Sequence, residues 1–243
     1  MTTVPVLAIC NHKGGTGKTS TALHLIRHWQ RQGYTPLGID LDPQGNLTRA
    51  LGGSIDGGPS IGDVLARRAT IQYATQVGAG DVHLVGSDIR LEDTSAAIQG
   101  KSPNHQFLAA SLRSGALNHG VVVIDCAPAA NILTINALVA ASHILIVLDP
   151  ELDAIDGMRR IVTMIAWLRD ELGQAPTIVG AVVNKVQNNT LLHRANLETI
   201  LGEIHVAGIV PYRRGLDAEQ QIGDAFAPIA AAVWSRMEEP ANA

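Results

Sequence analysis

Short apolar runs alternate with longer segments of mixed polarity along the whole chain. A brief run of Val, Ile and Leu bounded by polar or glycine-rich residues is typical of a strand buried on both faces. Two runs flank the turn Gly78-Ala-Gly-Asp81 and predict strands at residues 70–77 and 82–86. The same reasoning predicts strands at 4–10, 35–41, 121–124, 143–148, 177–183 and 205–210.

The segments between these runs carry apolar residues at helical spacing. In residues 17–32, Ala22, Ile26 and Trp29 recur about one helical turn apart. Residues 42–60 are rich in Gly, Asp, Pro and Ser, and we expect a loop with one short helix there. Further helices are expected from Ser60, at 88–114 with a break near Pro103, and at 131–140, 153–172, 190–202, 217–223 and 228–239.

This alternation of strand and helix predicts a single doubly wound α/β domain across residues 1–243, with a mostly parallel sheet flanked by helices. In such sheets, ligands bind at the carboxyl ends of the strands. Because the polar motifs described below all follow predicted strands, we expect them to meet at that edge of the sheet.

Composition narrows the functional classes further. Of the 243 residues, 46% are hydrophobic and only 3% aromatic, which suits aliphatic strands packed between helices. The formal net charge of −4 means that any DNA binding must come from a local basic patch. No apolar stretch reaches the roughly 18 residues of a membrane span, and no signal peptide is visible. We therefore expect a cytoplasmic protein.

Four residues that could ligate a metal are better explained by packing. Cys10 and Cys126 end apolar runs and form no Cys-x-x-Cys pair, so we expect buried, reduced thiols. His24 and His28 lie four residues apart on a predicted helix, but no third ligand is evident. We expect ordinary packed or surface imidazoles.

The strongest chemical signal is a glycine-rich stretch between the first strand and the first helix. Its glycines let backbone N–H groups approach a phosphate, and the following helix offers its positive N-terminus. Lys18 can reach the β- and γ-phosphates of a nucleotide, and the Thr19 hydroxyl can ligate Mg²⁺. The predicted phosphate-binding residues are Lys13, Gly14, Gly15, Thr16, Gly17, Lys18, Thr19 and Ser20.

The start of this stretch departs from the standard phosphate loop. His12 stands where its first glycine would be, and Lys13 follows. This arrangement resembles the deviant Walker A motif of the ParA/MinD family of P-loop ATPases. In that family the early lysine reaches across a dimer interface to the phosphates of the other subunit. The resemblance implies the same role for Lys13, an ATPase activity, and ATP and Mg²⁺ as cofactors.

Two aspartate segments extend the resemblance. Residues 39–46, Ile-Asp-Leu-Asp-Pro-Gln-Gly-Asn, are similar to a family segment in which Asp42 positions the attacking water and Asp40 supports the site. Residues 121–125 resemble a Walker B strand that places Asp125 beside the Mg²⁺ shell. The resemblance thus implies Lys13, Lys18 and Asp42 as catalytic residues. It implies Thr19, Asp42 and Asp125 as the metal site.

Later segments match the family more loosely. Residues 149–157 take the place of a loop that senses the nucleotide and faces the dimer partner. Asn184 resembles the base-recognising position, where an amide can pair with an adenine edge. Pro211 lies in a segment that resembles the loop closing over the base.

Branches of this family differ in the target that the ATP-bound dimer binds. The Gln-Gly-Asn segment and the small size favour a ParA-type ATPase, which binds DNA non-specifically and positions a plasmid, chromosome or other cargo. This implies a homodimer when ATP is bound, association with the nucleoid, and a ParB-like or other adaptor that stimulates hydrolysis.

Three alternatives stay open. A MinD-like membrane-cycling ATPase is disfavoured because residues 228–243 hold one Arg and two Glu, unlike a basic anchor, so we expect no membrane contact. An iron–sulfur branch would need characteristically spaced cysteines. A kinase or ligase-like transferase could share the fold.

The DNA-contacting residues cannot be transferred from the family one by one. Many ParA proteins carry an Arg after the strand that ends at Asn184, whereas residues 187–190 here read Gln-Asn-Asn-Thr. The candidates in this chain are Arg159, Arg160, Arg194, Arg213 and Arg214.

Overall fold

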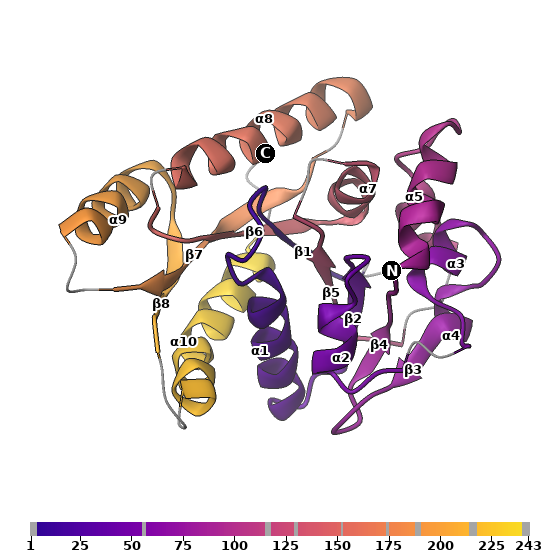
Figure 1. Cartoon of the computed structure of the whole chain (residues 1–243), viewed down its shortest axis with the longest axis horizontal. Coiled ribbons are helices and arrows are strands. Elements are labelled where there is room, and N and C mark those ends of the chain that lie inside the picture. Colours follow the sequence, from indigo (N-terminus) through magenta and orange to yellow (C-terminus); the bar gives the residue numbers. More distant parts are fainter. Residues whose placement is uncertain are drawn as a thin grey trace.

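An eight-stranded sheet forms the centre of the molecule, in the order β3-β4-β2-β5-β1-β6-β7-β8 (Figure 1). The computed structural model describes residues 4–54, 57–114, 118–128, 131–151, 153–173, 175–187, 191–213 and 218–239. The strands are β1 (Val6–Cys10), β2 (Pro36–Leu41), β3 (Thr75–Val77), β4 (His83–Val85), β5 (Val121–Cys126), β6 (His143–Leu148), β7 (Thr177–Val186) and β8 (Val206–Pro211). All neighbouring strands run parallel except β3 and β4. The predicted α/β class with a mostly parallel sheet is confirmed.

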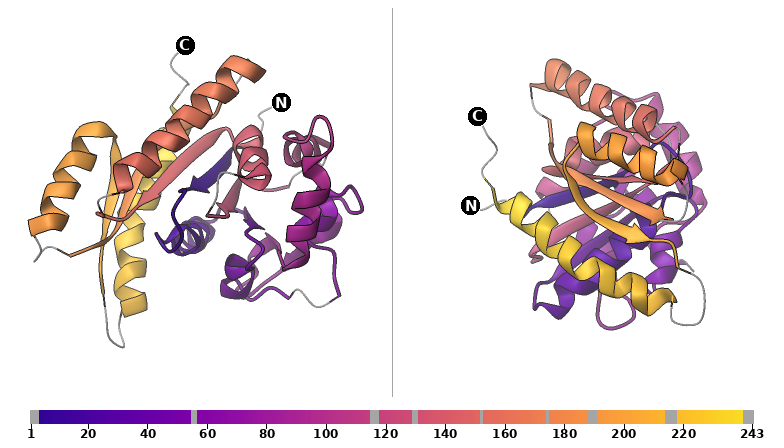
Figure 2. Two further views of the ribbon diagram at one scale, coloured as in Figure 1. Left: turned by 45° about the horizontal axis from the view of Figure 1, so that its top comes forward. Right: turned by 90° about the vertical axis from the view of Figure 1, so that its left-hand side faces the viewer.

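Helices cover both faces of this sheet (Figure 2). They are α1 (Lys18–Arg31), α2 (Asn46–Ala50), α3 (Ile61–Leu65), α4 (Ile71–Ala74), α5 (Arg90–Gln99), α6 (Phe107–Ser114), α7 (Ile132–Ala140), α8 (Ala154–Leu172), α9 (Leu191–Glu203) and α10 (Ala218–Glu238). Apolar residues of α1, α2 and α10 pack on one face, and those of α3 to α9 pack on the other. The sheet is therefore the middle layer of three.

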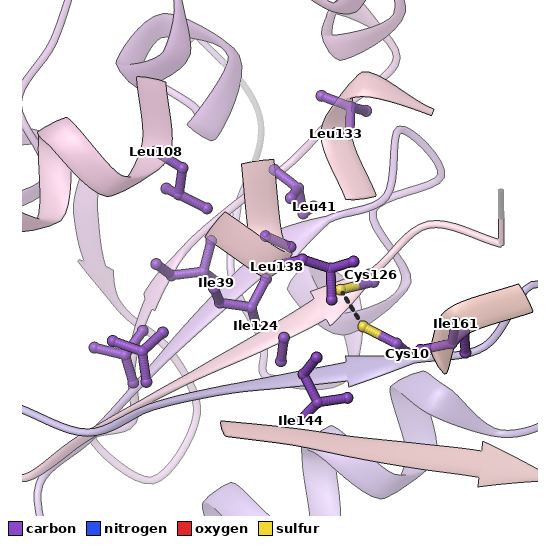
Figure 3. Packing of buried hydrophobic residues seen from close by; sticks show 14 of the residues in the cluster. Cys10, Ile39, Leu41, Leu108, Ile124, Cys126, Leu133, Leu138, Ile144 and Ile161 are labelled. Atoms are coloured by element: carbon purple, nitrogen blue, oxygen red, sulfur yellow. Dashed lines mark hydrogen bonds between the residues drawn. The ribbon is translucent and has the colours of Figure 1, made fainter. Parts of the chain in front are cut away.

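The central strands are apolar on both sides because both sides are covered. Along β1, Val6, Ala8 and Cys10 point into the core beneath α7 and α8, whereas Leu7 and Ile9 point toward α1 and α10. Figure 3 shows the first of these cores, where Cys10 and Cys126 lie side by side. Their sulfur atoms are 3.3 Å apart and both thiols are free and buried, as the sequence predicts.

One prediction was wrong in the segment 70–77. Its first half is the helical turn α4, and only Thr75–Val77 form a strand, which is antiparallel to β4. The Thr70 side chain accepts a hydrogen bond from the backbone N–H of Tyr73, which starts a helical turn despite the strand-like alternation.

A second difference concerns the C-terminal helices. Two segments were predicted at 217–223 and 228–239, but α10 runs without interruption from Ala218 to Glu238 with Pro228 inside it. Pro228 is exposed, while Phe226 and Ile229 on either side are buried. Packing of the buried face holds the helix together across the missing N–H of proline. Positions 190 and 217, predicted as helix starts, lie outside the described residues.

Candidate functional site

Polar residues follow five strands that are neighbours in the sheet. The phosphate loop follows β1, Asp42 follows β2, Asp125 lies near the end of β5, and Asp149 follows β6. Asn184 lies near the end of β7. Since β2, β5, β1, β6 and β7 are adjacent and parallel, these positions share one edge of the sheet.

The phosphate loop has the backbone that its glycines predict. Gly15 and Gly17 adopt left-handed conformations, with φ of 75° and 102°. A side chain at Gly17 would also overlap the amide of Asn184. Helix α1 begins at Lys18 directly after Gly17, so its free N–H groups lie at the loop. The loop and helix start together form an anion-binding geometry.

Lys18 is held inside this loop. Its Nζ donates a hydrogen bond of 3.1 Å to the backbone carbonyl of Lys13, and the residue is only 6% exposed. Burial lowers the pKa of Lys18, and the nearby carboxylate of Asp125 acts in the opposite direction. A buried cation at a helix start is well placed to bind an anion.

Lys13 lies at the mouth of the loop rather than inside it. Its Nζ is 3.0 Å from Asp153 Oδ1 and 3.5 Å from Asp149 Oδ2. The hydrogen bond to Asp153 raises the pKa of Lys13, and the same bond lowers the pKa of Asp153. In this structure Lys13 is therefore paired with the loop that follows β6.

The two aspartates at the carboxyl end of β2, Asp40 within the strand and Asp42 just after it, have different surroundings. Asp40 accepts hydrogen bonds at 2.8 and 2.7 Å from the backbone N–H and hydroxyl of Thr48, which ties the strand end to α2. Burial raises the pKa of Asp40 despite these bonds. Asp42 is 8% exposed and accepts one bond of 2.9 Å, from the backbone N–H of Gln44. Asp40 thus supports the segment, and Asp42 has one carboxylate oxygen that accepts no hydrogen bond from the described residues.

Asp125 is the most unfavourably placed carboxylate of the site. It is fully buried, and neither of its oxygens accepts a hydrogen bond of good geometry in the part of the chain described here, although the nearby Thr19 side chain acts to lower its pKa. Burial, followed by the negative charge of Asp40 opposite it on β2, raises the pKa of Asp125 to about 8. Two unpartnered carboxylate oxygens beside Lys18 are what a divalent cation would satisfy.

Asn184 contacts the phosphate loop directly. Its Nδ2 donates a 2.8 Å hydrogen bond to the carbonyl of Thr16, and its Oδ1 accepts one of 2.9 Å from the N–H of Lys185. One N–H and one lone pair of the amide stay available for a base. Pro211 ends β8, the strand next to β7.

The arginines proposed for DNA contacts are spread over α8, α9 and the end of β8. Arg159 forms an ion pair of 3.1 Å with Glu203, which links α8 to α9. Arg160 lies 3.0 Å from His12 Nε2, beside the phosphate loop. Arg194 is on α9 and Arg213 is exposed after β8, while Arg214 lies outside the described residues.

The described residues contain neither a metal-binding cluster of His, Cys, Asp or Glu nor a membrane-spanning helix. They hold no group of three or more His, Cys, Asp or Glu side chains that could bind a metal. His24 is instead stacked on Phe226, with ring centroids 4.8 Å apart. None of the helices in these ranges is long and apolar enough to span a membrane.

Comparison with known proteins identifies the family. A sequence profile described as an AAA domain matches residues 4–178. The chromosome partitioning protein ParA of Caulobacter vibrioides is 33% identical over 187 residues, which cover 73% of this chain and 68% of the relative. The chain belongs to the ParA/MinD family of P-loop ATPases. Another family member, the sporulation initiation inhibitor protein Soj of Bacillus subtilis, is 29% identical over 77% of this chain and 75% of its own.

Other relatives are similar in sequence, and solved structures are similar in fold. The chain covers 47% and 46%, about half, of two longer relatives from Sinorhizobium fredii and Rhizobium rhizogenes, at 32% and 30% identity. A cobyrinic acid a,c-diamide synthase from Mycobacterium smegmatis, solved with an ATP analogue and magnesium, has a TM-score of 0.84 at 26% identity over 96% of both chains. McdA of Cyanothece in complex with ATP has the same fold, with a TM-score of 0.87 at 19% identity over 100% of both chains.

Several residues of the site escape sequence reasoning. Asn11 is buried, donates to the carbonyl of Val147 at 2.5 Å and accepts from the N–H of Lys13, so it fixes the start of the phosphate loop. Asp153 pairs with Lys13 across 140 positions of sequence. Such partners carry no local pattern, although the loose family match of residues 149–157, which rests mainly on Asp156 and Gly157, pointed to the region.

Proposed function

We propose that the chain is a ParA-type ATPase that forms an ATP-dependent sandwich dimer, binds DNA non-specifically and positions cargo with an adaptor protein. The position of Lys13 carries this proposal. Lys18 already occupies the interior of the phosphate loop, whereas the side chain of Lys13 lies at its mouth and is 39% exposed. Once released from Asp149 and Asp153, Lys13 would serve a nucleotide bound by another subunit.

The proposed chemistry is a Mg²⁺-dependent hydrolysis of ATP to ADP and phosphate. Lys18 would exchange its bond to the Lys13 carbonyl for the β- and γ-phosphates. Asp42, with a free oxygen, would orient the attacking water. An Asp is a weak base, so positioning rather than proton removal is its expected contribution.

The residues present fit a magnesium ion. Thr19 is the second residue of α1, beside the loop, and Asp125 offers two buried oxygens that accept no well-formed hydrogen bond from the described residues. These two residues and Asp42 would hold the ion, directly or through water. When bound, Mg²⁺ would neutralise charge on the phosphates. It would also compensate the negative charge of the buried Asp125 carboxylate.

Dimer formation is expected to release Lys13 from Asp149 and Asp153, since the same amine cannot serve both partners. DNA binding would then use arginines carried by α8, α9 and the segment after β8, in this chain Arg159, Arg160, Arg194, Arg213 and Arg214. The relatives named for chromosome partitioning support this role. In the bound state the protein would associate with the nucleoid.

Analytical ultracentrifugation with and without ATP and Mg²⁺ tests the dimer. We expect the wild-type protein to dimerise with ATP, Asp42→Ala to bind ATP and stay dimeric without turnover, and Lys18→Ala to lose nucleotide binding. Lys13→Ala should bind ATP as a monomer with hydrolysis reduced at least tenfold, a loss of about 1.4 kcal/mol of transition-state stabilisation. Lys101→Ala, an exposed lysine remote from the loop, is the control.

Co-sedimentation with DNA and with anionic liposomes tests the target of the dimer. ATP-bound protein should pellet with DNA in a salt-dependent manner, and each arginine that contacts a phosphate should contribute about one unit to the salt slope. Pelleting with liposomes but not with DNA would support a MinD-like ATPase instead. Full turnover of monomeric Lys13→Ala would favour a transferase that shares the fold.

A further inference from the structure

The regular pairing of β7 and β8 is interrupted at the functional edge. Val183 pairs with Ile209 and Val186 pairs with Pro211, so Asn184 and Lys185 together oppose the single residue Val210. This is a β-bulge, which is rare between parallel strands and commonly re-aims a side chain near a functional site. Lys185 has a φ of 57°, a left-handed conformation that a residue with a side chain seldom adopts.

The bulge turns Lys185 toward the phosphate loop. Its Nζ donates a hydrogen bond to the carbonyl of Gly15, a residue 170 positions away in sequence. The preceding residue, Asn184, donates to the next carbonyl, that of Thr16. Two consecutive residues of β7 therefore hold two consecutive carbonyl groups of the loop.

This pair of contacts determines where the loop's N–H groups point. In a trans peptide the C=O and the N–H of the same unit point in opposite directions. If the carbonyls of Gly15 and Thr16 face β7, the N–H groups of Thr16 and Gly17 face away from β7, into the loop. These N–H groups are the ones that a glycine-rich loop uses to bind phosphate oxygens.

We propose that Lys185 is a positioning residue for the phosphate loop, which holds the Gly15 peptide in its anion-binding orientation before the nucleotide arrives. The inference rests on the proposed ATP site and adds a third lysine to it, one that acts through the loop backbone. Its strained backbone is explained by this contact, since a relaxed β7 would direct the side chain elsewhere.

Substitution of Lys185 by Asn separates the amine from the backbone strain. Asn tolerates the left-handed conformation but has no ammonium group. We expect Lys185→Asn to raise the KM for ATP and the Kd for a fluorescent ATP analogue about tenfold, with kcat changed less than threefold. A loop that binds the ground state and the transition state of ATP hydrolysis equally well affects KM and Kd rather than kcat. The unfolding temperature without nucleotide should not fall.

Two further variants complete the test. Lys185→Arg keeps a cationic donor and should recover most of the lost affinity, while Lys101→Asn, remote from the loop, should bind ATP like the wild-type protein. Binding by Lys185→Asn within twofold of the wild type would overturn the inference. If the wild-type protein itself bound no ATP, the proposed function would fail instead.

If the wild-type protein bound no ATP, a measurement without nucleotide would still test whether Lys185 positions the loop. Amide ¹⁵N order parameters of Thr16 and Gly17 should lie near the rigid value of about 0.85 in the wild type and fall below about 0.6 in Lys185→Asn. Equal order parameters in both proteins would show that Lys185 does not position the loop.

Discussion

At the scale of single residues, the site brings together buried ionisable groups that their protein neighbours only partly compensate. Asp125 is buried and accepts no well-formed hydrogen bond from the described residues, and burial lowers the pKa of Lys18 and raises that of Asp40. Burying ionised groups disfavours folding unless a partner compensates for the lost hydration. These buried groups therefore lower the free energy of unfolding, and binding of a phosphate and a cation would raise it again. Stability that depends on the ligand in this way suits a protein whose state depends on its nucleotide.

Substitution of Asp125 by Asn should stabilise the nucleotide-free protein. The pKa of Asp125 in the folded state is about 8, above the ordinary 3.8, so the folded protein holds this proton more tightly than the unfolded chain does. The contribution of Asp125 to stability is therefore full below about pH 4 and is lost as the pH rises toward 8, and Asp125→Asn lacks this loss. Near pH 8, urea unfolding in the presence of EDTA should show a gain of about 1–3 kcal/mol for the variant.

The gain should vanish near pH 4, where both side chains are neutral. Asp170→Asn, on an exposed position of α8, is the matched control and should change stability little at either pH. A gain for Asp125→Asn that was the same at pH 4 and pH 8 would contradict a buried carboxylate of raised pKa.

At the scale of elements, close packing against the sheet determines where α10 lies and how far it extends, which its local sequence does not predict. Gly208 on β8 faces Ile229 on α10 so closely that a methyl group on Gly208 would overlap the Ile229 side chain. This contact brings α10 against β8 and α1, where Trp29 also donates to the carbonyl of Ala230 at 3.3 Å. The same packing keeps α10 helical across Pro228.

Two glycine substitutions should therefore have opposite effects on stability. Gly208→Ala should destabilise the protein by about 1–3 kcal/mol, because α10 must move to admit the methyl group. Gly202→Ala, in α9 with open space around its Cβ position, should stabilise it by about 0.5–1 kcal/mol through helix propensity. Chemical denaturation of both variants provides the comparison, and a loss of stability for both would show that α9 is not the helix described.

The sequence predicts the elements whose signals are local and misses those set by distant contacts. The aliphatic runs place β1, β2, β5 and β6 to within about two residues, and the phosphate loop is recognised from its glycines. The segment 70–77 alternates like a strand, but a single side-chain cap at Thr70 turns half of it into helix. Lys185 gives no signal of its own, because its role depends on a bulge and on a loop 170 positions away.

At the scale of the whole molecule, the nucleotide site is built from five adjacent strand ends, which belong to both halves of the sheet. The sheet carries β1 in its middle, with Asp42 and Asp125 reached through β2 and β5 on one side. Asp149 and Asn184 are reached through β6 and β7 on the other. A ligand that contacts both groups connects parts of the chain that are far apart in sequence, and it should raise the stability of the molecule as one unit.

ATP with Mg²⁺ should raise the thermal midpoint of the wild-type protein. At a ligand concentration about 100 times Kd, binding to the folded state contributes about 2.7 kcal/mol, or about 5–10 °C for a chain of this size. The shift should grow with protein concentration if the ATP-bound form is a dimer. Differential scanning calorimetry should show no shift for Lys18→Ala and the full shift for Lys101→Ala. A shift independent of protein concentration would speak against dimer formation.

The two edges of the sheet have a consequence for how this molecule assembles. One edge is the three-residue strand β3, antiparallel to its neighbour, and the other is β8, which adjoins the bulge and ends in Pro211. Short, irregular or proline-terminated edges offer few consecutive N–H and C=O groups for strand addition. Edges of this kind disfavour the edge-to-edge pairing that leads to fibres, which suits a protein whose proposed function includes repeated self-association.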